Sequence, residues 1–126
     1  MTDDIFLLDS NICIYHLLGQ PPTLAVKLRA HRGRVVTSSV CYGEVMMGIV
    51  GKGGGPDEGA RSLFRQIEVL PFDRAAADSY AQLPFRRARF DRLIAAHALS
   101  VGAVLVTNNP ADFADIPQLR TENWAA

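Results

Sequence analysis

Four short runs rich in apolar and β-branched residues recur along this chain, and a segment with the pattern of a helix follows most of them. The runs span residues 5–8 (IFLL), 34–38 (RVVTS), 68–72 (EVLPF) and 103–107 (AVLVT). An unbroken apolar run such as the first is typical of a strand buried on both faces, as in parallel sheets. The alternation therefore predicts an α/β fold, with three α/β/α layers and a mainly parallel central sheet.

Capping residues mark where the helices are expected to begin. Ser10 or Asn11 can cap the helix after the first strand, Ser38 or Ser39 the helix after the second, and Asp73 the helix after the third. Helices are expected over residues 12–18, 23–32, 40–50, 60–67, 74–83 and 91–101, with a short helix over 109–116 and a possible last strand over 119–123. The glycine-rich stretch between the third and fourth helices predicts a loop.

Composition limits the classes of protein to consider. The chain has 126 residues, 48% of them hydrophobic and 21% charged, which fits a single domain over residues 1–126. The formal net charge of +0 excludes a global basic field for nucleic acid. Cys13 and Cys41 are expected to be free, packed thiols. An acidic N-terminus and the lack of a long apolar run predict a soluble, cytoplasmic protein without a membrane partner.

Two acidic residues stand where the chain is otherwise apolar. Asp9 directly follows the first strand, so it is expected at the edge where parallel sheets bind ligands, although it could merely cap the next helix. Glu44 has Val40, Cys41 and Met47 at helical spacing, which predicts a carboxylate on an apolar face. The alternatives are that Glu44 pairs with a buried arginine or points outward.

Asp91 is a third acid of this kind, because it begins the apolar stripe of DRLIAAHAL, although an acid also suits the first turn of any helix. Two carboxylates about 4 Å apart repel by about 4 kcal/mol at an effective dielectric constant near 20, so a cluster of acids favours a cation between them. Oxygen ligands suit Mg²⁺ or Mn²⁺, and such ions serve phosphodiester hydrolysis. Asp9, Glu44 and Asp91 are therefore the expected metal ligands.

The carboxyl end of the fourth strand supplies further candidates. Asn109 can act as a neutral ligand or orient a water, although NNP is also an ordinary turn and helix cap. Secondary candidates for the site are Ser10, Asn11, Thr107 and Asp112. His97 is expected to be a buried structural histidine, and GIVGKG is a weak match to a phosphate-binding loop because it follows a helix.

Two basic runs bear on the partner. The run at 27–34 is interpreted as a solvated helix face. The run at 86–92 could be explained in the same way, but it flanks Asp91 and is expected to contact RNA or another partner. The arginines of this second run are Arg86, Arg87, Arg89 and Arg92.

Five stretches, in order, resemble the PIN-domain ribonucleases and, within them, the VapC-type toxins. They are LLDSNICIYHL, TSSVCYGEVMMG, IEVLPFDRAAADSYAQL, DRLIAAHALSVGAVLVTNNPADF and LRTENW. The resemblance implies a PIN-like fold and a Mg²⁺- or Mn²⁺-dependent endoribonuclease, usually a homodimer, that a small antitoxin holds inactive. It also implies that Asp9, Glu44 and Asp91 bind the metal ion.

The sequence differs from this family at two places near the expected site. Many members have a fourth acid at the position of Asn109, and the segment before Asp91 is longer in relatives than PFRRARF. The expected function is cleavage of RNA by a metal-activated water, with Asp9, Glu44, Asp91 and Asn109 as catalytic residues. One alternative is a catalytically weak module that binds RNA or an antitoxin. The other, a phosphotransfer domain with Asp9 as nucleophile, lacks the accompanying acid and lysine.

Overall fold

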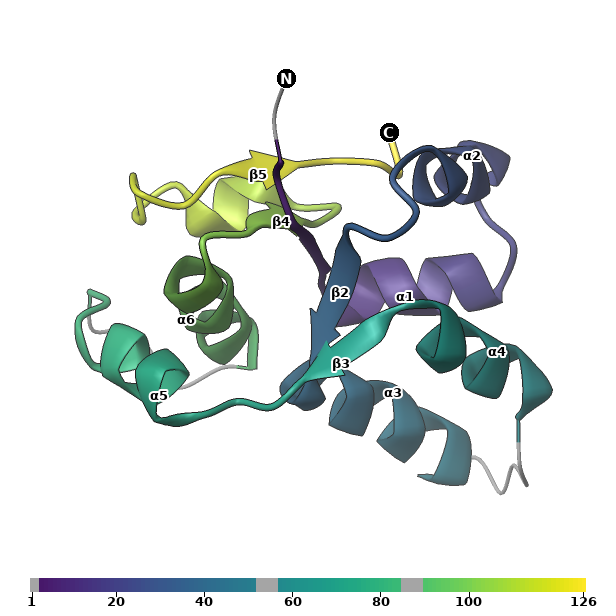
Figure 1. The fold of residues 1–126 in the computed structure, drawn as a ribbon, viewed down its shortest axis with the longest axis horizontal. Coiled ribbons are helices and arrows are strands. Elements are labelled where there is room, and N and C mark those ends of the chain that lie inside the picture. The colour runs from purple at the N-terminus through teal and green to yellow at the C-terminus, as the bar shows by residue number, and fades with distance from the viewer. Residues whose placement is uncertain (1–2, 52–56, 85–89) are drawn as a thin grey trace.

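The computed structural model describes residues 3–51, 57–84 and 90–126 (Figure 1). Its core is a five-stranded sheet in the order β3-β2-β1-β4-β5, in which every neighbouring pair is parallel. The strands are β1 (Phe6–Leu8), β2 (Val35–Ser38), β3 (Glu68–Leu70), β4 (Val104–Val106) and β5 (Thr121–Glu122). The parallel sheet predicted from the sequence is confirmed.

Helices cover both faces of the sheet, as the three-layer prediction requires. They are α1 (Ser10–Leu17), α2 (Pro22–Ala30), α3 (Ser39–Gly51), α4 (Glu58–Gln66), α5 (Arg74–Ala81) and α6 (Phe90–Val101), with a 3₁₀ helix, η1 (Pro110–Phe113). In Figure 1, α1, α2 and α4 lie on one side of the sheet and α5 and α6 on the other. No helix in the described ranges is long and apolar enough to cross a membrane.

Alternate residues of β1 enter two separate hydrophobic clusters, because successive side chains of a strand point to opposite faces. Phe6 and Leu8 pack with side chains of α1, α2 and α4, whereas Leu7 packs with those of α6 and the segment after β4. Cys13 and Cys41 are buried free thiols in these clusters, as predicted.

The prediction that Ser10 or Asn11 caps the first helix is wrong, whereas the alternative that Asp9 caps it is confirmed. The N-cap of α1 is Asp9, whose side chain accepts a hydrogen bond from the backbone N–H of Ile12, and neither Ser10 nor Asn11 has this role. The other predicted caps are confirmed: Ser38 accepts from the N–H of Val40, and Asp73 caps α5. Asp9 takes the cap because the chain turns into the helix directly after β1.

Several elements are shorter than predicted. The third strand ends at Leu70, because Pro71 has no backbone N–H to continue the ladder. The segment expected as a short helix over 109–116 contains only the four residues of η1. Gly102 ends α6 with a φ of 68°, a left-handed conformation that glycine adopts without a steric cost.

Candidate functional site

The carboxyl ends of the three central strands, β2, β1 and β4, form the base of the site. Leu8 is paired with Thr37 of β2 and Val106 of β4, so the next residues along these strands, Asp9, Ser38 and Thr107, come together at one edge. In the order β3-β2-β1-β4-β5, the connection that leaves β1 runs to β2 on one side and the connection that leaves β4 runs to β5 on the other. Open parallel sheets bind ligands where such connections diverge.

Asp9 is the most constrained acid of this edge. Its exposed fraction is 8%, and the carboxylate accepts hydrogen bonds from the N–H of Ile12 at 2.9 Å and from the side chain of Thr107. Burial raises the pKa of Asp9, and the negative charges of Glu44 and Asp91 raise it further. The two hydrogen bonds lower the pKa but do not cancel this rise. Both interpretations of Asp9 therefore hold, because it caps α1 and also faces two other acids.

Glu44 reaches this edge from α3, where it is half-buried. The hydroxyl of Ser10 donates a 2.5 Å hydrogen bond to Oε1 of Glu44 and thereby fixes the carboxylate next to Asp9. The apolar face predicted around it is only partly correct, since Cys41 is fully buried but Met47 is 68% exposed. Glu44 thus lies at the border of the core, where the hydroxyl of Ser10 can donate a hydrogen bond to its carboxylate.

Asp91 comes from the first turn of α6 on the other side of the sheet. Its Oδ1 atom is buried without a hydrogen-bond partner among the described residues, and its charge acts on Asp9. A buried carboxylate oxygen without a donor is costly, so this atom is available to a cation. The structure places the three acids that the sequence singled out, from the N-cap of α1, from α3 and from α6, within electrostatic range of one another.

This donor set fits a divalent ion chemically. Carboxylate oxygens are the ligands that Mg²⁺ and Mn²⁺ prefer, and an ion among them would remove the mutual repulsion that raises the pKa of Asp9. As they stand, however, the acidic, histidine and cysteine side chains of the described ranges do not form a group of three that could hold an ion. The acids are within electrostatic range of one another but are not closed around a ligand.

The secondary candidates divide into two groups. Ser10 and Thr107 belong to the site, because they hydrogen-bond to Glu44 and Asp9. Asn109 is exposed, and its backbone N–H donates to Oγ1 of Thr107 at 3.1 Å. It is the N-cap residue of η1, but its side chain makes no capping hydrogen bond. Asn11 and Asp112 are exposed as well.

The prediction that Arg92 contacts RNA does not fit the structure. Arg92 is 6% exposed, and its Nη2 donates to Oδ1 of Asp115 at 2.8 Å in an ion pair inside the protein. The other predicted RNA contacts, Arg86, Arg87 and Arg89, lie outside the described residues.

Two links were missed by the sequence analysis. The Ser10–Glu44 hydrogen bond joins residues 34 positions apart, and His97 is hydrogen-bonded through Nδ1 to the hydroxyl of Ser38, 59 positions away. The expectation of a buried structural His97 is confirmed. Sequence patterns signal periodicity along one element, whereas these bonds depend on which helices meet at the edge of the sheet.

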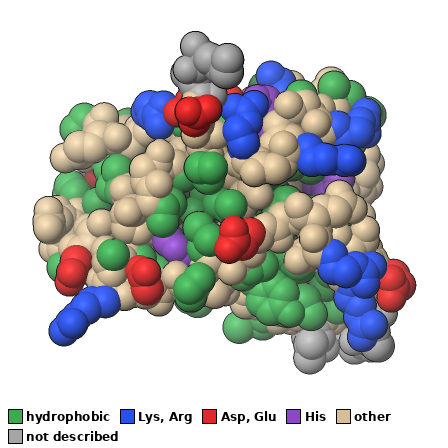
Figure 2. All heavy atoms as spheres, in the orientation of Figure 1, with side chains coloured by type: hydrophobic (Ala, Val, Ile, Leu, Met, Phe, Trp, Pro, Cys, Tyr) green, Lys and Arg blue, Asp and Glu red, His purple; other side chains and the backbone are tan. Residues whose placement is uncertain are grey.

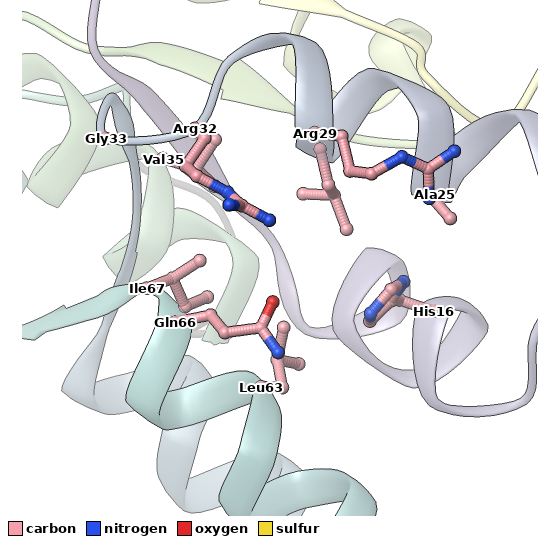
Figure 3. Close-up of a pocket in the computed structure, with 10 residues that line it drawn as sticks. His16, Ala25, Arg29, Arg32, Gly33, Val35, Leu63, Gln66 and Ile67 are labelled. Atoms are coloured by element: carbon pink, nitrogen blue, oxygen red, sulfur yellow. The ribbon is translucent and has the colours of Figure 1, made fainter.

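A separate cavity of about 560 Å³ lies near the amino ends of β2 and β3, away from the acids (Figure 3). Its side chains come from α1, α2, α4 and the loop after α2, and Arg29, Arg32 and His16 give it cationic or titratable groups over an apolar floor. Figure 2 shows basic side chains gathered on the same side of the molecule, over α2 and α4. None of its lining residues is an acid of the edge described above.

Comparisons with known proteins agree with this geometry. The family model for the PIN domain matches residues 6–119. The tRNA(fMet)-specific endonuclease VapC of Shigella flexneri is 34% identical over 130 residues, which cover 95% of this chain and 98% of that protein.

Solved structures of VapBC proteins have the same fold. VapBC from Salmonella typhimurium, solved with DNA bound, has a TM-score of 0.81 and 30% identity, covering 96% of this chain and 98% of the other. VapBC2 from Rickettsia felis, solved with a DNA fragment from its promoter, has a TM-score of 0.81 and 28% identity. The match covers 95% of this chain and 98% of the other.

Proposed function

Because this chain belongs to the VapC family of PIN-domain endoribonuclease toxins from type II toxin–antitoxin systems, we propose that it cleaves RNA with a Mg²⁺ or Mn²⁺ ion bound by Asp9, Glu44 and Asp91. PIN-domain nucleases generally use divalent metal ions. The whole chain, residues 1–126, acts as one PIN-like domain in this proposal.

The observation that supports the metal site is the concentration of negative charge around the buried carboxylate of Asp9. Burial raises the pKa of Asp9, and the negative charges of Glu44 and Asp91 raise it further; among the described residues, Oδ1 of Asp91 is buried without a hydrogen-bond donor. Perturbed carboxylates at the carboxyl edge of a parallel sheet are typical of functional sites. A purely structural cluster of this kind would cost stability without a compensating contact.

Each side chain has a separate task in the proposed reaction. A bound divalent ion supplies an activated water and neutralises charge on the phosphodiester. Asp9, Glu44 and Asp91 would hold the ion, and Ser10 would keep the carboxylate of Glu44 in place through its hydroxyl. Thr107 keeps Asp9 ionised by donating to its carboxylate. Asn109, at the exposed end of β4, orients a water or the substrate.

The substrate class we propose is transfer RNA. The relative from Shigella flexneri is described as specific for tRNA(fMet), and its similarity to this chain extends over almost the entire length of both. Initiator tRNA is therefore the first substrate to test, with a ribosomal-RNA fragment as the comparison.

The partner we propose is a small cognate antitoxin, since the similar solved structures are VapBC complexes that bind DNA. The cavity in Figure 3 is a suitable surface for it, because an apolar floor beside Arg29 and Arg32 fits an amphipathic segment with acidic side chains. We further propose that the toxin is a cytoplasmic homodimer, with the exposed Met47 and Tyr42 of α3 as part of the contact.

The test is cleavage of initiator tRNA and of the ribosomal-RNA fragment by antitoxin-free protein, with Mn²⁺, with Mg²⁺ and with EDTA. Discrete products that require the metal ion and are lost in Asp91→Asn are expected. Mn²⁺ binding measured by calorimetry in wild type and Asp9→Ala separates the alternatives. Metal binding without any products would favour a binding module or another RNA, and the absence of metal binding would contradict the proposed site.

A further inference from the structure

A buried ion pair lies next to the acidic edge and has no part in the reaction described above. Nη2 of Arg92 and Oδ1 of Asp115 are 2.8 Å apart, and the exposed fractions of the two side chains are 8% and 20%. The other terminal nitrogen of Arg92, Nη1, is buried and has no hydrogen-bond partner in the ranges that the structure describes. Such a pair is costly to bury, so it calls for an explanation beyond packing.

The pair connects two segments that carry residues of the site. Arg92 directly follows Asp91 in the first turn of α6, and Asp115 lies in the segment after β4 that begins with Thr107 and contains Asn109. In Figure 1 this segment lies beside α6. The ion pair therefore joins the start of the helix that bears Asp91 to the segment that holds Asp9 through Thr107.

Attachment of the two segments does not require this pair. Phe113 and Ile116, on either side of Asp115, are already buried in the same hydrophobic cluster as Ile94 and Ala95 of α6. Apolar contacts hold elements together but are not directional, whereas a charged hydrogen bond fixes a distance and an angle. The contribution specific to the ion pair is thus orientation.

Orientation matters most at the place where this pair acts. The first turn of a helix is its least constrained part, because the first backbone N–H groups have no partner within the helix. Asp91 lies in that turn, and within the described part of the chain its buried Oδ1 accepts no hydrogen bond that would fix it. The side chain of the next residue, Arg92, is anchored there by its bond to Asp115.

We propose that Arg92 and Asp115 are positioning residues that hold the first turn of α6 so that Asp91 can bind the divalent ion together with Asp9 and Glu44. This inference rests on the proposed metal site. Groups that orient metal ligands from outside the first coordination shell typically affect metal affinity by about 10–100-fold.

The test measures Mn²⁺ affinity by calorimetry and the melting temperature in EDTA for three variants. Asp115→Asn removes one charge, the double variant Arg92→Met/Asp115→Leu replaces the pair with apolar side chains, and Asp4→Asn removes the exposed ion pair with Arg120 as a matched control. The double replacement is expected to retain the melting temperature, since apolar pairs commonly substitute for buried ion pairs.

Both Asp115→Asn and the double variant are expected to bind Mn²⁺ about ten-fold or more weakly than wild type, whereas Asp4→Asn binds it equally well. Arg92→Lys, which keeps the charge but loses the planar fork, is expected to give an intermediate affinity. A purely structural pair would give the opposite pattern, with wild-type Mn²⁺ affinity in any folded variant that lacks it, and this result would overturn the proposal.

Failure of the metal site itself gives a different result. Wild-type protein that does not bind Mn²⁺, or binds it equally in Asp9→Ala, would overturn both the proposed metal site and this role of the ion pair. Wild-type binding that is lost in Asp9→Ala but unchanged in Asp115→Asn and the double variant would overturn only the positioning role.

Discussion

Ser10 on α1 donates a 2.5 Å hydrogen bond to Oε1 of Glu44 on α3, and this bond links two helices that follow different strands. It is possible because Asp9, and not Ser10, caps α1, which leaves the hydroxyl of Ser10 free to reach across. One residue thus supplies the cap and an acid of the site, while its neighbour orients a second acid. The turn after β1 therefore positions two of the three acids of the site.

Removal of the Ser10 hydroxyl is expected to impair cleavage more than stability. In Ser10→Ala, Glu44 loses its donor, so we expect RNA cleavage to fall by about 10–100-fold and the free energy of unfolding by about 1 kcal/mol. The matched control is Ser62→Ala, which removes an exposed hydrogen bond from Gln66 on α4. Equal cleavage by the two variants would show that the Ser10–Glu44 bond has no role in the reaction.

Neutralising Asp9 is expected to stabilise the metal-free protein while abolishing cleavage. Its pKa is raised in the folded state, mainly by burial, above the ordinary value of 3.8, so folding favours the protonated form. The stability this provides is complete below pH 3.8 and is lost as the pH rises through the raised pKa. Asp9→Asn keeps the cap on α1, because asparagine caps helices as well as aspartate.

Urea unfolding of wild type and Asp9→Asn in EDTA, from pH 4 to pH 8, measures this effect. The free energy of unfolding of the variant should exceed that of wild type by an amount that grows with pH and then levels off. A difference that does not change with pH would contradict the raised pKa. Cleavage by the variant is the second readout and should be absent.

The hydrogen bond from Thr107 opposes the raised pKa of Asp9 and should therefore set the pH range of metal binding. A hydrogen bond to a charged group contributes about 1.5–3 kcal/mol, so Thr107→Val is expected to weaken Mn²⁺ binding by roughly ten-fold or more below neutral pH. The loss should shrink at higher pH, where Asp9 is ionised without help. Thr107→Ser retains the hydroxyl and should behave as wild type in calorimetry at both pH values.

The strands and the three acids could be predicted from the sequence, because the evidence for them is local. A continuous apolar run such as residues 5–8 predicts a buried strand, and an acid directly after it lies at the ligand-binding edge. Asp91 could be placed from the helical spacing of the apolar residues that follow it. The family resemblance then agreed with residues already singled out.

The features that were missed depend on contacts between distant elements. Arg92 belongs to a basic run, a pattern typical of an exposed surface, yet it is buried against Asp115, 23 positions away. Nothing in the spacing of the run distinguishes Arg92 from the other arginines. The cap on α1 was assigned one residue too late because serine, asparagine and aspartate are nearly equal caps, so only the backbone decides among them.

Mn²⁺ itself is expected to stabilise the protein, because a ligand that binds only the folded state shifts the unfolding equilibrium. At an Mn²⁺ concentration 100 times the dissociation constant, the free energy of unfolding should rise by about 2.7 kcal/mol, which for a domain of this size is a rise in melting temperature of several degrees. The site needs all three acids, so Asp91→Asn should lose this shift and cleave RNA at least about 100-fold more slowly than wild type.

The control for this measurement is Asp78→Asn, an exposed acid on α5 that should keep the full thermal shift. Scanning calorimetry of the three proteins with and without Mn²⁺ gives the comparison directly. If Asp91→Asn retained the shift of wild type, the ion would be bound elsewhere, since Asp91 contributes the one buried carboxylate oxygen among the described residues of the site that accepts no hydrogen bond. Loss of the shift in Asp91→Asn alone would place the ion at the edge where Asp9, Glu44 and Asp91 converge.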